Sequence, residues 1–281
     1  MLTEEQKAFR KTCLGGSSVA AALGLHPWQS AIEVWAEKAM GIDLQTERPV
    51  MRLGSFLEPF VRNELVAQGY EIGPGEDCLR HPECDFMGAN TDGTVHIDGE
   101  RGVLEIKSMS PRKWWQCRKD GAPPLHYQIQ CQHYMACTGL PFALLVALNR
   151  DTGEIETFML ERNDRFIEER LIPAARELWE CIESKTPPAW DGSDSCERAL
   201  RAIYPEPEPD AIVPMPECAT TADALEEANA TKREADALAR ELRNELRAIL
   251  KDGERGDLGD GRYVKRRKVG RGETVEVKEW K

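Results

Sequence analysis

The chain of 281 residues has no long apolar run and no cysteine spacing typical of a metal site. No segment approaches the roughly 20 apolar residues of a membrane-spanning helix, and residues 1–7 do not read as a signal peptide. The nine cysteines include no Cys-x-x-Cys, and the closest pairs, Cys78 with Cys84 and Cys131 with Cys137, are separated by five residues. We therefore expect a cytoplasmic protein with reduced thiols, no membrane anchor, and no zinc or iron–sulfur site.

An excess of positive charge is also missing, because 49 acidic residues face 37 basic ones and the net charge is −12. This balance argues against a protein that coats nucleic acid without specificity. The distribution is more informative, since residues 101–150 carry seven basic and two acidic residues, a local charge of +5. Such a stretch suits a site that grips phosphate. The alternative is a solvated helix face.

The order of patterns along the chain predicts one large domain followed by a smaller appendage. We expect helices within 1–45 and over 53–68, 125–138 and 163–185, and strands over 86–97, 103–109, 142–148 and 155–160. Five prolines with interspersed acids predict an extended linker over 191–219 (Pro205, Pro207, Pro209, Pro214, Pro216). Residues 220–251 have the apolar stripe of a charged helix, and a short basic hairpin is expected after it.

One short motif combines three residues that together suggest chemistry. In Leu104-Glu105-Ile106-Lys107 the strand period of two places Glu105 and Lys107 on one face and the apolar pair on the other. Asp98-Gly99 is a hairpin turn signal, and a reversal there would bring Asp92 level with the Glu-x-Lys pair. Two carboxylates can hold a divalent cation, and an ammonium beside them can orient an anionic group. Since an isolated Glu-x-Lys is usually a surface salt bridge, the motif needs support from elsewhere.

Two further segments offer that support. Glu58 precedes Pro59 near the expected first turn of the helix over 53–68, where proline is tolerated. Tyr127, Gln130 and Tyr134 are spaced to share one helix face. A glutamine can orient a water or bind a metal through its carbonyl, and a tyrosine can bind a phosphate. The alternatives are an ordinary exposed acid and a helix that packs through its aromatic side chains.

Together these pieces resemble a known family. The ordered set is Gly15-Gly16-Ser17 with Leu25-His26-Pro27-Trp28, Arg52-Leu53-Gly54-x-x-Leu57-Glu58-Pro59, Arg80-His81-Pro82, Ala89-Asn90-x-Asp92-Gly93, Leu104-Glu105-Ile106-Lys107 and Gln130-x-Gln132-His133-Tyr134. Over about residues 8–185 it resembles the YqaJ-type viral recombinases, which are similar to the lambda-type exonucleases of the PD-(D/E)xK nuclease superfamily. Each motif alone is weak, but the order and spacing of the set are specific.

The resemblance implies an α/β (α+β) fold with a restriction-endonuclease-like core, a central mixed β-sheet flanked by helices, and a C-terminal helical and hairpin appendage. It also implies a metal site made by Asp92, Glu105, the Ile106 carbonyl and Glu58, which would hold two Mg²⁺ ions, with Mn²⁺ as a substitute. Lys107 would position or activate the attacking water, and Gln130 would hold that water or the scissile phosphate.

For the substrate, the resemblance implies that Arg10 and Ser17 bind a terminal 5′-phosphate. The tyrosine of the expected helix face and two residues of the basic stretch complete the predicted substrate-binding set (Tyr127, Arg112, Lys113). Family members degrade one strand of duplex DNA from a 5′ end and leave a 3′ overhang for a single-strand annealing protein. Some assemble as a ring of three around the DNA.

We therefore expect a Mg²⁺-dependent 5′→3′ exonuclease that acts on double-stranded DNA ends for annealing-based recombination, in a phage or prophage context. The expected domains are the nuclease at 1–190, the linker at 191–219 and an accessory segment at 220–281. A structure-specific or helicase-linked endonuclease is the alternative within the same chemistry. A catalytically silent DNA-end-binding scaffold is the alternative from another class, and the complete Asp92, Glu105 and Lys107 set argues against it.

Overall fold

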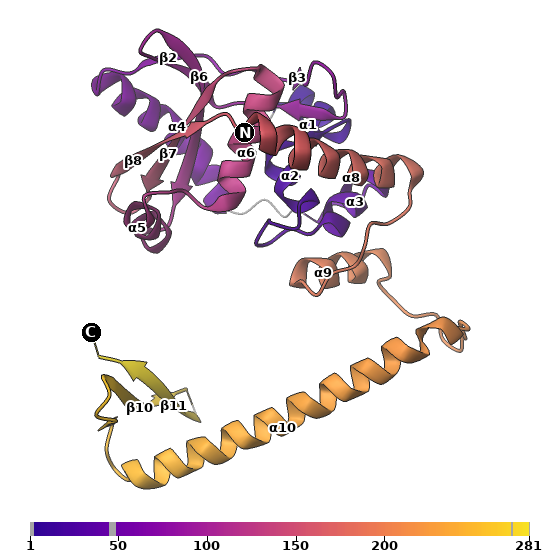
Figure 1. Ribbon diagram of the computed structural model, residues 1–281, viewed down its shortest axis with the longest axis vertical. Helices are drawn as coiled ribbons and strands as arrows, with labels where there is room; N and C mark the ends of the chain where they lie inside the picture. The colour runs from indigo at the N-terminus through magenta and orange to yellow at the C-terminus, as the bar shows by residue number, and fades with distance from the viewer. Residues whose placement is uncertain (1–2, 45–48, 271, 281) are drawn as a thin grey trace. The chain divides into compact units, whose positions relative to one another are not determined.

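The computed structural model describes residues 3–44, 49–270 and 272–280. By internal contacts the chain forms two compact units, Met1–Pro207 and Glu208–Lys281 (Figure 1). Among the described residues no helix is long and apolar enough to cross a membrane.

A five-stranded mixed sheet organises the first unit. Its order is β2 (Glu71–Gly73), β5 (Gly93–Ile97), β6 (Glu100–Met109), β7 (Phe142–Asn149) and β8 (Ile155–Glu161). The β6–β7 pair is parallel and the other three pairs are antiparallel. Strand β7 is buried along its whole length, as its continuous apolar run predicts for a strand covered on both faces.

The predicted hairpin is confirmed, since β5 and β6 pair antiparallel around Asp98 and Gly99. Both turn residues have positive φ, 53° and 83°, which is the backbone that a two-residue type I′ turn requires. The register pairs Gly93 with Leu104. Asp92, one residue earlier, therefore lies beside Glu105.

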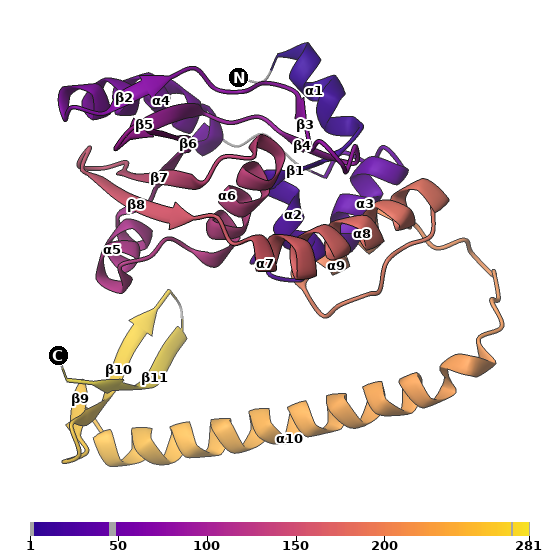
Figure 2. The ribbon, with the colours of Figure 1, turned by 45° about the horizontal axis from the view of Figure 1, so that its top comes forward.

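Helices cover both faces of this sheet (Figure 2). On one face α4 (Pro49–Ala67) packs through Val61 and Leu65 against a cluster that includes Leu104 and Ile106. The opposite face carries the larger core, which is built with helices α2 (Gly16–Ala22), α3 (Ala31–Ala39), α5 (Pro111–Asp120) and α6 (Leu125–Thr138). A continuous helical run also packs here, and it consists of α7 (Asp164–Phe166), Ile167–Leu171 and α8 (Ile172–Ser184). The middle part of that run, Ile167–Leu171, is a π-helical turn. Val103 and Met109 face this side, so the alternation along β6 is as the sequence predicts.

The crossover from β6 to β7 runs through α5 and α6, and each helix ends at a glycine with positive φ, Gly121 and Gly139. Helix α6 is buried on nearly all sides. A helix without a solvent face belongs in the centre of a domain, and here α6 contacts α2, β4, β6 and β7.

A second sheet corrects the expected strand over 86–97. The chain is irregular over 90–92, so β4 (Met87–Ala89) and β5 belong to different sheets, and β4 lies between β1 (Leu14–Gly15) and β3 (Leu79–Arg80). The break has a local cause: the Asn90 and Thr91 side chains accept hydrogen bonds from the backbone N–H groups of Cys78 and Glu76. These bonds compete with continued strand pairing.

Two helix predictions also need correction. Helix α4 begins at Pro49, so Glu58 lies mid-helix and Pro59 is an internal proline; Pro49 itself suits the first helical position better. Within the expected extended linker, Asp194–Ile203 forms helix α9, which contacts α3. There the Ser195 hydroxyl donates a hydrogen bond to the Glu33 carboxylate, and both side chains are buried. Helix α1 (Glu4–Lys11) completes the first unit.

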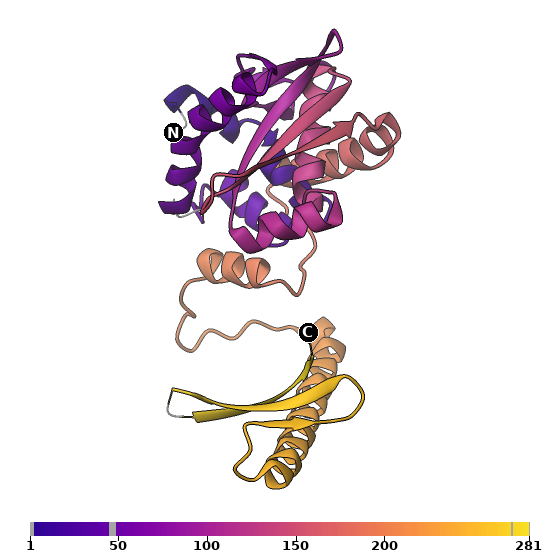
Figure 3. The same cartoon turned by 90° about the vertical axis from the view of Figure 1, so that its left-hand side faces the viewer.

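The second unit consists of a short turn (Pro216–Cys218), a long helix α10 (Ala219–Leu250) and an antiparallel sheet of β9 (Arg255–Asp257), β10 (Arg262–Val269) and β11 (Gly272–Glu279). The structure confirms the predicted helix and hairpin and adds β9 (Figure 3). No residue of α10 is buried in the part of the chain that is described.

Candidate active site

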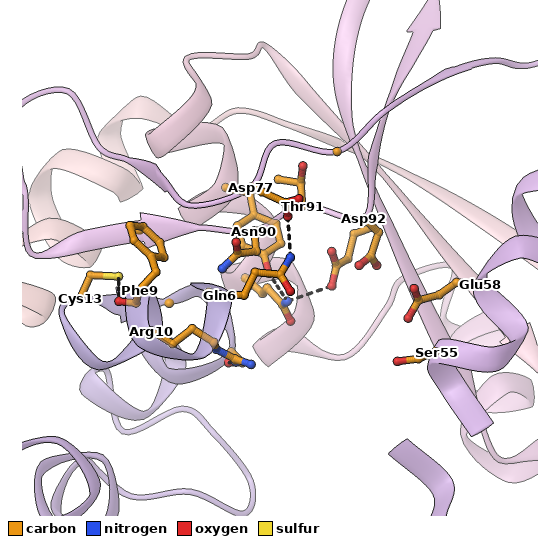
Figure 4. Close-up of a pocket in the computed structure, with 18 of the residues that line it drawn as sticks. Gln6, Phe9, Arg10, Cys13, Ser55, Glu58, Asp77, Asn90, Thr91 and Asp92 are labelled. Carbon is orange, nitrogen blue, oxygen red and sulfur yellow. Dashed lines mark hydrogen bonds between the residues drawn. The ribbon is translucent and has the colours of Figure 1, made fainter. Parts of the chain in front are cut away.

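A cavity of about 440 Å³ lies where α1, α2, α4, β6 and α6 converge. Figure 4 looks into it, with Phe9 and Arg10 of α1 on one side and Ser55 and Glu58 of α4 on the other. Asp92 points into the space between them. The same cavity is lined by the other predicted catalytic side chains, Glu105, Lys107 and Gln130.

Asp92 is placed by the break between the two sheets. Its Oδ2 accepts a hydrogen bond of 2.8 Å from the Ile106 N–H of β6. Its own carbonyl accepts 2.8 Å from the Arg62 guanidinium, which also reaches the Gly73 carbonyl. Arg62 of α4 therefore ties the strand ends together on backbone atoms.

Glu105 is the most buried carboxylate of the site, with 2% of its side chain exposed. Its Oε1 accepts from Lys107 Nζ at 2.5 Å and from Gln130 Nε2 at 2.8 Å. Its Oε2 is buried and has no hydrogen-bond partner among the described residues. Burial, reinforced by the charge of Asp92, raises the pKa of Glu105 above its usual range. This carboxylate therefore has both an unused oxygen and an environment that favours further positive charge beside it.

Lys107 stays charged at neutral pH. Burial opposes that charge, but the carboxylates of Glu105 and Asp92 outweigh it and raise the pKa of the ammonium. The side chain is 22% exposed, and its Nζ lies 5.1 Å from the centre of the Tyr127 ring. A charged, partly exposed ammonium at this place can meet an anionic substrate.

Gln130 is oriented from two sides. Besides its bond to Glu105, its Nε2 lies 2.8 Å from the Tyr134 hydroxyl, one turn along α6. Helix α2 packs closely against this pair, since a Cβ built on Gly16 would lie 2.6 Å from Tyr134 Cε1 and 3.0 Å from Gln130 Cγ. The close approach of α2 and α6 therefore depends on a glycine.

Glu58 of α4 lines the same cavity on the side of Asp92 (Figure 4). Burial, followed by the charge of Asp92, raises the pKa of Glu58. Among the described residues no three His, Cys, Asp or Glu side chains form a ready-made metal cluster. The donor set still fits Mg²⁺, because this ion is usually held by one or two carboxylates together with waters and substrate phosphate. The unpartnered Glu105 Oε2 is consistent with such a ligand.

The predicted phosphate pair is brought together at the other end of the cavity. Arg10 Nη2 donates a hydrogen bond of 2.7 Å to Ser17 Oγ, across seven residues of sequence. The Arg10 carbonyl accepts from Lys38 Nζ at 2.5 Å. The Arg10 guanidinium and the Ser17 hydroxyl thus line one wall of the cavity. Together these two hydrogen-bond donors suit an anion with several oxygens, such as a phosphate.

The remaining predicted residues line a second cavity of about 910 Å³, which shares Ser55, Glu58 and Lys107 with the first. Its wall contains the predicted substrate-binding residues Tyr127, Arg112 and Lys113, together with Trp28 and Arg150. Lys113 Nζ lies 4.3 Å from the centre of the Trp28 ring and 5.2 Å from that of Tyr127.

Sequence reasoning did not assign three residues that this geometry brings forward. Arg62 acts through backbone carbonyls, and Arg150 follows strand β7, so neither lies in a motif of its own. Trp28 stood in the motif Leu25-His26-Pro27-Trp28, but nothing local showed that it would meet Lys113.

The chain is similar to a known family model, to a related bacterial protein and to solved exonuclease structures. Residues 5–141 match the family model of the YqaJ-like viral recombinase domain. The chain is similar to "Uncharacterized protein YqaJ" of Bacillus subtilis (strain 168), 29% identical over 273 residues that cover 92% of this chain and 82% of YqaJ. Among solved structures it is similar to an alkaline exonuclease (LHK-Exo) from Laribacter hongkongensis, 26% identical with a TM-score of 0.55, covering 66% of this chain and 94% of the other. A structure of LHK-Exo in complex with dAMP matches equally well, at 25% identity and a TM-score of 0.55.

These matches confirm the resemblance that the ordered motifs predicted. Residues 5–141 are therefore similar to the YqaJ-like viral recombinase domain, and the first unit has the expected restriction-endonuclease-like core, a mixed sheet flanked by helices.

Proposed function

We propose that the chain is a metal-dependent DNA exonuclease that degrades duplex DNA from a 5′ end. One observation carries the proposal: Asp92, Glu105, Lys107 and Gln130 line one cavity. Glu105 contacts Lys107 at 2.5 Å and Gln130 at 2.8 Å, and Asp92 accepts a hydrogen bond of 2.8 Å from the N–H of Ile106. The structural likeness to an alkaline exonuclease supports the same reaction class.

The metal would be held by Asp92 and Glu105, with Glu58 and the Ile106 carbonyl completing the site. Bound Mg²⁺, or Mn²⁺ in its place, supplies an activated water and neutralises charge on the phosphate in a phosphodiester hydrolysis, and two ions are expected. The chain's own contribution is to hold these oxygens in place before substrate arrives. Gln130 fixes Glu105 through Oε1, and the Ile106 N–H fixes Asp92.

Lys107 would act on the substrate side. Its ammonium is charged, partly exposed and 2.5 Å from Glu105 Oε1, so it can stabilise negative charge on the reacting phosphate and orient the attacking water. Gln130 would contact the water or the scissile phosphate through the same amide group.

The two cavities suggest how a strand runs through the site. Arg10 and Ser17 would bind the terminal 5′-phosphate in the smaller cavity. Tyr127, Arg112 and Lys113 would hold the strand on the far side of Lys107. Cleavage between them would proceed from the 5′ end and leave a 3′ overhang.

We further propose the assembly that the family resemblance implies. Residues 1–190 would form the nuclease, 191–219 the connection and 220–281 an accessory segment. The overhang would pass to a single-strand annealing protein, and three copies would form a ring around the DNA.

The decisive experiment compares linear duplexes labelled at the 5′ or the 3′ end with a closed circle, in Mg²⁺ and in EDTA. We expect Mg²⁺-dependent loss of the 5′ label from linear DNA and an intact circle. Lys107→Ala should abolish cleavage while DNA binding in EDTA stays largely intact. The exposed Lys119 of α5 provides a matched control, since Lys119→Ala removes an equal charge outside both cavities.

Three outcomes would contradict parts of the proposal. Persistent Mg²⁺-dependent degradation by Lys107→Ala would refute the assigned mechanism. Cutting of the circle would indicate an endonuclease, and binding without any cleavage would indicate a DNA-end scaffold. Arg10→Ala should remove the preference for 5′-phosphorylated over 5′-hydroxyl ends, and an unchanged ratio of the two rates would exclude Arg10 from the end-binding site.

A further inference from the structure

The sheet of the second unit has one face that helix α10 does not cover. On the other face Val264 is 2% exposed, and a Cβ on Gly256 would lie 2.9 Å from Leu250 Cδ2 of α10. Because side chains alternate along a strand, Tyr263, Lys265 and Arg267 of β10 point away from the helix. We call this side the open sheet face.

Neighbouring strands add to the open sheet face in register. Arg255 of β9 is paired with Lys265, and Lys278 of β11 is paired with Tyr263. Partners in a pleated sheet share a face, so these two cations lie beside the β10 side chains. Figure 3 shows the three strands with α10 along one side.

Two aromatic rings stack on this face. The Tyr263 and Trp280 rings have centroids 4.2 Å apart at an interplanar angle of 28°, and the Arg255 guanidinium lies 5.6 Å from the centre of the Tyr263 ring. The Trp280 backbone N–H donates to the Gly261 carbonyl at 3.0 Å, which anchors its position. Its side chain is nevertheless 47% exposed. An exposed aromatic stack is a ready surface for another flat ring.

The charge of the central strand complements an anionic partner. Strand β10 contains five basic residues and no acidic one (Arg262, Lys265, Arg266, Arg267, Lys268), although the whole chain has a net charge of −12. Of these, Lys265 and Arg267 lie on the open sheet face, where Arg255 and Lys278 of the neighbouring strands add two more cations. Two acids of the described strands lie on the open sheet face. Asp257 of β9 is paired with Tyr263 and accepts a hydrogen bond from the Gly259 N–H. Glu276 of β11 lies 3.1 Å from Lys278 and 3.9 Å from Arg267. These ion pairs are solvent-exposed and therefore weak, so phosphate oxygens can replace the carboxylate.

We propose that the open sheet face binds single-stranded DNA, with bases stacked on Trp280 and Tyr263 and phosphates held by Lys265 and Arg267. Stacking on an exposed ring requires bases whose faces are free, which a duplex does not offer, and exposed aromatics beside cations are the usual elements of single-strand binding. The nuclease reaction proposed above would supply such a strand as its 3′ overhang. The binding itself does not depend on cleavage.

The test measures binding of the full chain to a fluorescent 20-nucleotide oligothymidine in EDTA, by anisotropy at several salt concentrations. We expect Trp280→Ala to raise Kd about tenfold, because stacking on one ring contributes that order of affinity. Trp280→Phe should retain most of the binding. The matched control is Trp190→Ala, which removes another exposed tryptophan.

A second variant leaves the aromatic stack in place. Lys265→Gln with Arg267→Gln should lower the slope of log Kd against log salt by about 1.4, since each phosphate contact on a single strand contributes about 0.7. Lys232→Gln with Arg233→Gln, on exposed positions of α10, should leave the slope unchanged.

Unchanged affinity and salt slope in the sheet variants would overturn the proposal. So would equal binding of a polyglutamate peptide with the same dependence on Trp280, because the surface would then fit an acidic protein segment. Since all measurements are made in EDTA, failure here does not affect the proposed nuclease, and failure of the cleavage assay does not affect this result.

Discussion

Gly16 offers a sharp test of how the site is built, because a single methyl group added there meets two site residues. Gly16 is the first residue of α2, and its added Cβ would lie 2.6 Å from Tyr134 Cε1 and 3.0 Å from Gln130 Cγ. Tyr134 is 6% exposed and cannot swing into solvent. The Gly16→Ala variant must therefore move α2, the Tyr134 ring or the Gln130 side chain.

Two opposing effects set the size of the change. Replacing glycine by alanine in a helix usually stabilises by about 0.5–1 kcal/mol. Overpacking a rigid contact costs about 1–3 kcal/mol, so we expect a net loss near 1 kcal/mol. A displaced Gln130 would also lose its 2.8 Å hydrogen bond to Glu105. A hydrogen bond to a charged group contributes about 1.5–3 kcal/mol, and the cleavage rate should fall at least about tenfold.

Gly15 provides the matched control, since a Cβ at that position meets nothing within 4 Å. Urea unfolding should separate the two variants, with Gly15→Ala close to the parent chain, and single-turnover cleavage of a linear duplex should be slower for Gly16→Ala than for the parent. The reasoning is refuted if Gly16→Ala cleaves at the parent rate, or if Gly15→Ala is equally impaired.

Three further predictions concern the fold around the site. Gly102→Ala should lower the free energy of unfolding by about 2 kcal/mol, because its Cβ would lie 2.1 Å from the Phe142 ring; parent-like urea stability would contradict this packing. His133 is buried, and burial lowers the pKa of its imidazole from 6.5 to about 4. A lowered histidine pKa favours the neutral folded state, so stability is retained above pH 6.5 and lost as the pH falls toward 4. Between pH 7 and 5 the parent should lose about 2 kcal/mol more than His133→Gln in urea unfolding, and equal losses would exclude this contribution. Ser195→Ala removes the buried bond to Glu33 and should loosen α9 by about 1–3 kcal/mol, measured as faster proteolysis at α9; an unchanged rate would show that the bond is dispensable.

Local sequence patterns were sufficient to predict the helices and strands that have a clear hydrophobic pattern of their own. The apolar run over 142–148 predicted a buried strand, and Phe142–Asn149 is buried throughout. The expected helix over 125–138 has the observed bounds of α6. Elements without such a signal were missed, among them the two-residue strands β1 and β3. Strand β1 pairs with the distant β4, Leu14 with Met87, and β3 is too short to show a periodic pattern. Helix α9 was hidden by the proline-rich context, although Ser193 caps its first turn through the Cys196 N–H.

Tertiary contacts decided the parts of the site that sequence could not predict. Strand alternation placed Glu105 and Lys107 on one face, and helix periodicity grouped Gln130 with Tyr134. Nothing local required that α6 cross that face of β6 with the Gln130 amide 2.8 Å from Glu105 Oε1. The need for glycine at position 16 likewise follows from the close approach of α2 to α6. The sequence showed Gly16 as part of a motif but gave no reason why a larger residue would not fit there.

The position of Glu105 within β6 explains how the fold can keep a buried carboxylate. Leu104 and Ile106, on the opposite face, are 0% and 8% exposed and pack with α4. That apolar burial holds β6 in place whatever Glu105 contributes, and burial of the carboxylate itself disfavours its charged form. Local rules of stability are most often broken at functional sites. Here Lys107 and Gln130 share Oε1 while Oε2 has no partner among the described residues, so the fold fixes the carboxylate through one oxygen and leaves the other for a ligand.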